Sequence, residues 1–312
     1  MPHYKLKMIN ERIRLDAVEF VAACDLDYQE KINLAADAIC ENMHISPIVL
    51  LSGPSGSGKT TTATKIAEEL TRRGVGSYSI ALDNYFKDIT VDTPKTRDGV
   101  HDLESPFCLD IDYLNGHFTA LSRGEVVEVP KYDFPNQRRA AEPSKLLKLG
   151  QDEIAIFEGI HALNDMITMK HPEAFKLYIS ARSNILNDER RSVFKGTWMR
   201  LVRRVVRDSL FRGAHPNYTM ALWANVRKGE KKYISPFKEK ANLMLDSSLP
   251  YEVSLMKTKA PQVILKVEDG VERFEEIRSI VPAFEQFLEI DESIVPENSL
   301  IREFIGGGIY DS

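Results

Sequence analysis

Cysteine is scarce in this sequence, and its placement suggests neither a bridge nor a metal site. The 312 residues include three cysteines, Cys24, Cys40 and Cys108. Their number is odd, their spacing is wide and no CxxC pair is present, which argues against a disulfide framework and a zinc site. Unpaired, widely spaced cysteines are typical of a protein that works in a reducing compartment.

Long apolar runs are missing as well. Residues 48–51 form one of the longest, far short of the roughly 20 apolar residues that a membrane-spanning helix needs. Near the N-terminus, Lys5 and Lys7 are not followed by an apolar segment, so we expect no secretion signal. These absences lead us to expect a cytoplasmic protein without a membrane partner.

The sequence also lacks an excess of positive charge. Its net charge is -5, and 43% apolar with 28% charged residues is ordinary for a globular protein. Non-specific binding to nucleic acid depends on a basic surface, so we expect no nucleic-acid partner. The length allows one large domain or two ordinary ones, and a homo-oligomer stays open.

The apolar spacing predicts helices and strands that alternate along the chain. Helices are predicted over 10–44, 61–73, 109–122, 184–211 and 271–288, with a short one near 300–305. Strands are predicted over 47–52, 78–82, 153–157, 175–179 and 251–255. This alternation indicates an α/β fold with a mostly parallel sheet covered on both faces. Residues 84–108 and 123–150 interrupt the rhythm and are candidate substrate loops or a small insertion.

A glycine-rich motif follows the first strand of that series. Residues 53–60 read Gly-Pro-Ser-Gly-Ser-Gly-Lys-Thr, which fits the spacing GxxxxGK[ST] of a phosphate-binding loop. Glycines let backbone N–H groups approach phosphate oxygens, and the N-terminus of the following helix favours an anion. Lys59 can reach the β- and γ-phosphates, and the Thr60 hydroxyl can bind Mg²⁺. The motif therefore predicts a nucleoside triphosphate ligand, MgATP above others.

Two acids stand directly after predicted strands. Asp83 follows the strand at 78–82, and Glu158 follows the strand at 153–157. Ligands of open α/β sheets bind beyond the carboxyl ends of strands, where an acid can orient Mg²⁺ or accept a proton. Either acid alone could be an ordinary capping residue, but two of them beside a phosphate loop favour function.

A basic stripe is predicted on the helix over 184–211. Arg200, Arg204, Asp208 and Arg212 are spaced four apart and share one helix face. The stripe could be a solvated ladder of ion pairs. It could equally supply mobile cations that close over a transferring phosphoryl group. The spacing alone leaves both interpretations open.

Taken together, these segments resemble the phosphoribulokinase/uridine kinase family of P-loop kinases. The resemblance rests on the phosphate loop and on four further motifs in the family's order: Asp83-Asn84-Tyr85-Phe86, Pro130-Lys131-Tyr132-Asp133-Phe134, Phe157-Glu158-Gly159-Ile160, and Arg203-Arg204-Val205-Val206-Arg207-Asp208 with Arg212-Gly213. The C-terminal run 298–307 is similar to the ending of a bacterial subgroup of uridine-kinase-like (nucleoside kinase) proteins.

The resemblance implies a fold and a set of roles. The fold is a three-layer P-loop kinase sandwich around a mostly parallel five-stranded sheet, with a substrate-binding insertion and a helical lid. Asp83, Lys59, Arg204 and Arg207 would be catalytic, with Asp83 as the base, and Thr60 and Glu158 would serve Mg²⁺. Further nucleotide-binding residues would be Gly53, Ser55, Gly56, Ser57, Gly58, Thr61 and Arg212. The acceptor would meet Asp83, Phe86, Glu104, Tyr132, Phe134, Gln137 and Arg204.

Some positions depart from the family's pattern. Gln137 stands where uridine kinases usually have a histidine, Ala214 where they usually have an arginine, and Phe86 where they have a tyrosine. The phosphate machinery is thus kept while the residues that read the base differ. The resemblance supports kinase chemistry more strongly than it supports uridine as the acceptor.

We therefore expect an ATP-dependent kinase that phosphorylates the 5′-hydroxyl of a nucleoside with the help of Mg²⁺. A kinase of another small alcohol or of a sugar phosphate is the closest alternative, and an ATP-sensing regulator without catalysis is an alternative of another class. The expected division is a helical segment over 1–45, a kinase domain over 46–258 and a helical extension over 259–312. The kinase domain would contain the insertion at 84–150 and the lid at 196–235.

Overall fold

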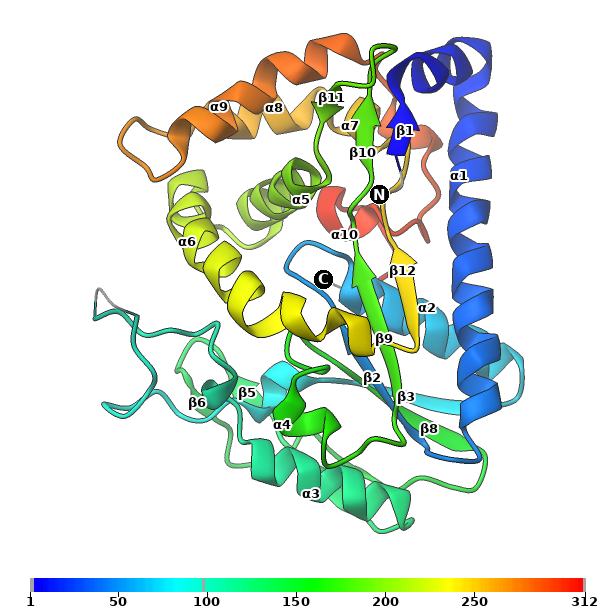
Figure 1. Cartoon of the computed structure of the whole chain (residues 1–312), viewed down its shortest axis with the longest axis vertical. Coiled ribbons are helices and arrows are strands. Elements are labelled where there is room, and N and C mark those ends of the chain that lie inside the picture. Colours follow the sequence, from blue (N-terminus) through cyan, green and yellow to red (C-terminus); the bar gives the residue numbers. More distant parts are fainter. Residues whose placement is uncertain (1–2, 97–98, 311–312) are drawn as a thin grey trace.

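The computed structural model describes residues 3–96 and 99–310. Its centre is a sheet of five strands that all run parallel, in the order β12-β9-β2-β8-β3 (Figure 1). The bounds are β2 Ile48–Ser52, β3 Gly76–Ala81, β8 Glu153–Glu158, β9 Phe175–Ser180 and β12 Leu243–Asp246. The parallel α/β sheet predicted from the sequence is confirmed.

Helices cover both faces of this sheet. Side chains alternate between the faces of a strand, so Val49 and Leu51 enter one apolar cluster while Ile48 and Leu50 enter another. The first cluster includes apolar residues of α1 (Leu6–Asn42) and α2 (Lys59–Arg72), and the second includes those of α3 (Ile111–Ser122) and α4 (Asp165–Thr168). Two helical layers and the sheet make the expected three-layer sandwich.

The register of the sheet aligns the strand ends that matter for the site. Leu51 of β2 and Ala81 of β3 both pair with Glu158, the last residue of β8. Because the strands are parallel, the segments that follow them leave the sheet at the same edge. The phosphate loop, Asp83 and Glu158 are brought together there.

The region over 84–150 adds two small antiparallel sheets of two strands each to the sandwich. Strand β4 (Val127–Val129) pairs with β7 (Lys145–Leu147), and β5 (Tyr132–Asp133) pairs with β6 (Arg138–Arg139). Further along the chain, the predicted lid consists of α5 (Gly196–Phe211), α6 (Pro216–Gly229) and a π-helical turn (Glu230–Ile234).

Both terminal segments pack into the main body. The C-terminal part contains short helices that share the larger apolar cluster with α1 and α5: α7 Glu252–Met256, α8 Lys259–Ile264, α9 Phe274–Ala283 and α10 Arg302–Ile305. Beside them, a three-stranded sheet joins the N-terminus to the region before α5, with β1 His3–Lys5, β10 Asn184–Leu186 and β11 Ser192–Phe194. The division of the chain into 1–45, 46–258 and 259–312 stays a proposal.

Two sequence predictions of secondary structure are wrong. Residues predicted as a strand over 251–255 lie in the buried helix α7, and the fifth strand is instead β12. A short apolar run does not distinguish a strand from a buried helical turn, and here Glu252 turns inward to pair with Arg203. The helix predicted over 184–211 begins at Gly196, because β10 and β11 occupy its first part.

No helix in the described ranges is both long enough and apolar enough to cross a membrane.

Candidate functional site

The phosphate loop joins β2 to α2 and has the backbone that its glycines allow. Gly56 and Gly58 adopt φ of 74° and 79°, a left-handed conformation that other residues rarely take. The N–H of Ser57 donates to the carbonyl of Pro54 at 3.2 Å, which closes the turn. Helix α2 then starts at Lys59, so its unpaired N–H groups point towards the loop.

The loop borders a polar cavity of about 240 Å³ that gathers most of the predicted site. Its lining combines residues from the loop, from the strand ends and from α5. The predicted residues that line it are Ser55, Gly56, Gly58, Lys59, Thr60, Asp83, Phe86, Glu104, Glu158, Arg204, Arg207 and Arg212. Of the remaining predicted residues, Gly53 and Ser57 lie inside the loop, the Thr61 hydroxyl donates to Glu303, and Tyr132, Phe134 and Gln137 line a neighbouring pocket.

Thr60 and Glu158 form the part of the cavity that suits a magnesium ion. The Thr60 hydroxyl donates to Oε1 of Glu158 at 3.2 Å. Burial raises the pKa of Glu158 to about 7, although Lys59 opposes the shift, so the buried carboxylate gains from a nearby cation. Mg²⁺ prefers oxygen ligands and is commonly held by one or two carboxylates together with substrate phosphates.

Thr60 and Glu158 provide only two ligands, which suits an ion whose other ligands come from nucleotide phosphates and water. Within the described ranges, no group of three or more His, Cys, Asp or Glu side chains could hold a metal ion by itself. A hydroxyl and a carboxylate beside a phosphate loop therefore fit an Mg²⁺ that arrives with the nucleotide. Thr60 and Glu158 are the residues that would hold it.

Asp83 faces the cavity. It lies in a short 3-10 turn, Leu82–Tyr85, directly after β3, and its side chain lines the cavity. Burial desolvates this carboxyl and raises its pKa, whereas the positive charges of Lys59 and Arg212 lower it. Desolvation likewise lowers the pKa of Lys59, although Glu158 and Asp83 oppose it. A carboxylate with a raised pKa is a better proton acceptor from a hydroxyl group.

The basic stripe of α5 faces the cavity and also forms the ladder of ion pairs. Arg204 donates from Nη1 to Oγ of Ser55 at 2.9 Å, and its Nε lies 3.3 Å from Oδ2 of Asp208. Arg207 and the more exposed Arg212 pair with Asp208 at 3.2 and 3.7 Å. The ion pairs of the ladder are present but largely buried around Asp208, and the same three arginines line the cavity, so their part in binding phosphate stays a prediction.

Neighbouring arginines of the same motif have a different environment. Arg203 is fully buried, with Nε 2.7 Å from Oε2 of Glu252 and Nη2 2.8 Å from the carbonyl oxygen of Ser247. Arg200 is also buried and pairs with Glu230, while its Nη1 donates to the Ser55 carbonyl at 3.2 Å. These two side chains support the loop and the core, whereas Arg204 and Arg207 line the cavity.

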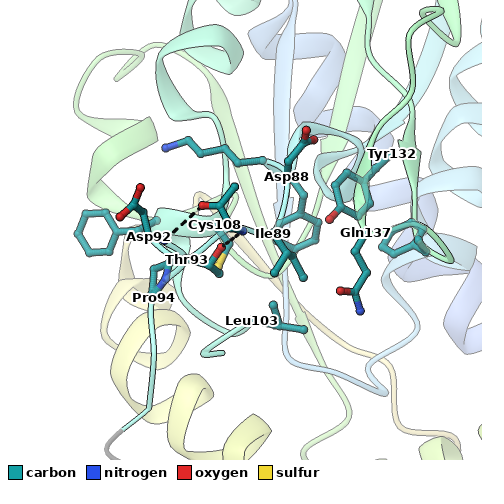
Figure 2. A pocket seen from close by; sticks show the side chains of 14 residues that line it. Asp88, Ile89, Asp92, Thr93, Pro94, Leu103, Cys108, Tyr132 and Gln137 are labelled. Carbon is teal, nitrogen blue, oxygen red and sulfur yellow. Dashed lines mark hydrogen bonds between the residues drawn. The ribbon is translucent and has the colours of Figure 1, made fainter. Parts of the chain in front are cut away.

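A second, larger pocket of about 490 Å³ adjoins the cavity (Figure 2). Phe86 and Leu103 line both spaces, so the two share a wall. In Figure 2, Tyr132 and Gln137 lie together at one side of the pocket, with Asp92 and Pro94 at the other. Most of the predicted acceptor residues therefore meet in one place beside the phosphate cavity.

The aromatic wall of this pocket is built from two segments of the chain. The ring of Tyr132 lies 5.6 Å from that of Phe86 and 5.1 Å from that of Phe134, measured between centroids. The N–H of Tyr132 donates to Oδ1 of Asn84 at 3.2 Å, which ties the hairpin β5–β6 to the turn that carries Asp83. Asn84 thus links the two segments, whereas the sequence placed it in a motif without giving it a role.

Sequence reasoning also missed Leu103 and Glu303 as lining residues of the cavity. Glu303 comes from α10, and its Oε2 accepts a hydrogen bond from the Thr61 hydroxyl at 2.7 Å. Thr61 was predicted to bind nucleotide, but its hydroxyl is engaged by the C-terminal segment. A signal was present in the sequence: Glu303 lies among apolar residues at helical spacing, and a buried acid needs a partner.

Comparisons with known proteins add the family context. Residues 48–253 match the Phosphoribulokinase / Uridine kinase family. The chain is 29% identical over 222 residues to the uridine kinase of Staphylococcus haemolyticus, covering 70% of this chain and 97% of that protein. It is 27% identical over 204 residues to the uridine kinase of Deinococcus deserti, covering 65% and 88% respectively.

One solved structure extends the comparison to the fold. A protein of Silicibacter sp. TM1040, provisionally named a fructose transport system kinase, superimposes with a TM-score of 0.51 at 20% sequence identity. The match covers 69% of this chain and 98% of that one. At this identity the likeness concerns the fold alone.

Proposed function

Because this chain belongs to the phosphoribulokinase/uridine kinase family, we propose that it is an ATP-dependent kinase that phosphorylates the 5′-hydroxyl of a nucleoside. The proposal covers three points that go beyond family membership. They are the use of MgATP as the phosphoryl donor, the nucleoside as the acceptor, and the roles of the individual site residues.

One observation carries the proposal. The cavity beside the phosphate loop and the aromatic pocket share Phe86 and Leu103 as a wall, and Asp83 opens into the cavity close to that wall. A molecule seated in the pocket can thus present a hydroxyl to Asp83 and to the end of a triphosphate on the loop. The pocket volume of about 490 Å³ lies within the usual range for small-molecule sites.

The proposed reaction is an in-line transfer of the γ-phosphoryl group. The acceptor oxygen forms a bond to the γ-phosphorus as the bond to the β,γ-bridging oxygen breaks, and ADP leaves. Asp83 takes the proton of the attacking hydroxyl. Lys59, Arg204 and Arg207 neutralise charge on the phosphate oxygens. Thr60 and Glu158 would hold an Mg²⁺, which would add positive charge there.

The chemistry of the pocket favours a neutral aromatic acceptor over a sugar phosphate. An acceptor that already carries a phosphate needs cations around that phosphate. The charged residues that line the pocket are Lys87, Asp88 and Asp92, so carboxylates outnumber the cation. Stacking on Phe86, Tyr132 and Phe134 suits the flat base of a nucleoside instead.

Acceptor-dependent release of ADP tests the proposal. The full chain is assayed with MgATP and a panel of ribonucleosides and deoxyribonucleosides, with ribulose 5-phosphate and fructose as acceptors of other classes. The Asp83→Asn variant is the matched control, because it keeps the shape of the side chain and removes its ability to accept the proton.

The outcomes separate the alternatives. Release with a nucleoside that Asp83→Asn abolishes supports the proposal, and the preferred base identifies the acceptor. Release only with a sugar or sugar phosphate keeps the kinase and rejects the nucleoside. Binding of MgATP without release for any acceptor favours an ATP-sensing protein and contradicts the proposal.

A further inference from the structure

The C-terminal segment 298–305 lies between the two helices that carry the predicted phosphate-binding residues. It contacts α2, which begins at the phosphate loop, and α5, which carries the arginines of the cavity. This segment lies outside residues 48–253, which match the family. The family match alone therefore assigns it no part in the site.

The contacts with the phosphate loop and α2 are close. The Asn298 carbonyl oxygen accepts a hydrogen bond from Nζ of Lys65 at 2.8 Å. Leu300 packs against the loop so tightly that a β-carbon at position 58 would stand 2.6 Å from its Cδ1. Oε2 of Glu303 then accepts the hydrogen bond from Thr61, in the first turn of α2.

The contacts with α5 involve adjacent residues of α10. Oε1 of Glu303 lies 3.4 Å from Nη1 of Arg207. The ring of Phe304 lies beneath the same guanidinium, with its centroid 5.7 Å from Cζ of Arg207. Arg207 is thus held by the carboxylates of Glu303 and Asp208 and by an aromatic face.

We propose that the C-terminal segment completes the nucleotide site and that Glu303 is a positioning residue, which orients Arg207 and the first turn of α2 towards the bound phosphates. The proposal rests on the function proposed above, because it assumes that the cavity binds MgATP. It extends that function by making residues outside the matched region part of the binding machinery.

Glu303 acts by ordering Arg207 rather than by changing the net charge of the cavity. An arginine side chain has many rotamers and loses conformational entropy when it is fixed. Glu303, Asp208 and Phe304 fix Arg207 before the nucleotide arrives, so less of that entropy is lost on binding. Glu303 has two carboxylate oxygens, and each engages one of the two helices. A single side chain therefore bridges α2 and α5 at the cavity.

Calorimetric binding of MgATP to the full chain tests the proposal without any acceptor. The variants are Glu303→Gln, Arg207→Gln and the double variant. Glu297→Gln is the matched control, because Glu297 belongs to the same C-terminal part, is exposed and undergoes the same loss of charge. We expect Glu303→Gln to weaken MgATP binding about fivefold to tenfold in the parent chain. In the Arg207→Gln background the same change should have a clearly smaller effect, because only the contact with Thr61 remains to be perturbed, and Glu297→Gln should bind like the parent.

Three results would overturn the proposal. Equal weakening by Glu303→Gln in both backgrounds would mean that Glu303 does not act through Arg207. Tighter binding would mean that the carboxylate only repels phosphates, and unchanged binding would mean that it plays no part. Glu303→Asp keeps the charge but shortens the side chain. It provides a second test should Glu303→Gln fold poorly, with an expected loss of affinity of about twofold to threefold and none if the proposal is wrong.

Failure of this inference can be told apart from failure of the proposed function. If the parent chain binds MgATP but phosphorylates no acceptor, the proposed function fails and the variants still test the inference. If the parent chain does not bind MgATP, both fail together. If the parent chain phosphorylates a nucleoside and Glu303→Gln binds MgATP normally, the inference alone fails.

Discussion

Gly229, the last residue of α6, lies so close to Glu104 that a β-carbon at position 229 would stand 2.5 Å from the β-carbon of Glu104. The backbone of Gly229 is helical, with φ of −58° and ψ of −46°, so alanine could adopt it without strain. The absence of a side chain at this position is therefore explained by the loop that carries Glu104, which packs directly against the predicted lid.

Replacing Gly229 with alanine is expected to displace Glu104 from the cavity. We predict that Gly229→Ala raises the KM for the acceptor about tenfold, equivalent to roughly 1.4 kcal/mol, while the KM for ATP changes little. Steady-state kinetics with each substrate varied in turn measures both values. Gly116→Ala is the control, because Gly116 lies in the interior of α3 with no atom within 4 Å of an added β-carbon. It should leave both KM values unchanged, and equal effects from the two variants would reject this explanation.

Replacing Arg204 should lower activity, whereas replacing the adjacent Arg203 should lower stability. Arg204 lines the cavity, so Arg204→Gln is expected to lower kcat by about a hundredfold to a thousandfold with little change in stability. Arg203 is a fully buried partner of Glu252, and breaking a buried ion pair leaves an uncompensated charge. Arg203→Met is expected to lower the free energy of unfolding by about 3–5 kcal/mol.

Urea unfolding and kinetics of the same samples distinguish these effects. The double variant Arg203→Met with Glu252→Met should recover most of the lost stability, because it leaves no unpaired charge in the core. The assignment of Arg203 to the core would be wrong if Arg203→Met remained as stable as the parent chain, or if the double variant were less stable than the single one.

The sequence predicted the centre of the site better than its periphery. The phosphate loop, Asp83 and Glu158 could be placed because each follows an apolar strand, and parallel strands end at the same edge of a sheet. The spacing of Arg204, Asp208 and the neighbouring arginines likewise indicated one helix face. These predictions depend on local pattern and on one general rule of α/β topology.

What the sequence could not provide depends on contacts between distant segments. The pairing of Glu303 with Thr61 spans most of the chain, and no local pattern states which helix α10 contacts. The residues 251–255 have the composition of a strand, but Glu252 is drawn into the core by Arg203, and the segment is helical. Tertiary contacts overrode local propensity at 251–255, whereas the contact of Glu303 is a long-range pairing on which local propensity has no bearing.

Phe134 offers a test of the acceptor pocket with little risk to folding. Its side chain is 56% exposed, yet it stands beside Tyr132 on the aromatic wall. If a base stacks there, Phe134→Ala should raise the KM for the acceptor about tenfold, since stacking of a base on an aromatic ring contributes roughly 1–3 kcal/mol. Leu146→Ala removes a similarly exposed apolar side chain from β7 of the same insertion and should have no effect on that KM. An unchanged KM in Phe134→Ala would exclude this residue from the binding of the acceptor.

His161 follows the strand end that carries Glu158 and is buried, with 2% of its surface exposed. Desolvation lowers the pKa of this histidine from 6.5 to about 4, and Lys59 adds to the shift, while backbone groups of Glu104 and Tyr233 act in the opposite direction. The unfolded chain therefore binds a proton near pH 6.5 that the folded chain does not bind until about pH 4. Stability consequently rises with pH across this window and is lost as the pH falls from about 6.5 towards 4.

We expect the free energy of unfolding of the parent chain to fall more than that of His161→Gln when the pH is lowered from 7 to 4. The excess should be on the order of 3 kcal/mol, because the glutamine does not titrate and each pKa unit corresponds to about 1.4 kcal/mol. Urea unfolding at several pH values measures it. His44→Gln is the control and should follow the parent chain, because an exposed histidine is hydrated in both states. Parallel stability profiles for His161→Gln and the parent chain would show that His161 binds protons equally in the folded and unfolded states, which would contradict a pKa lowered by burial.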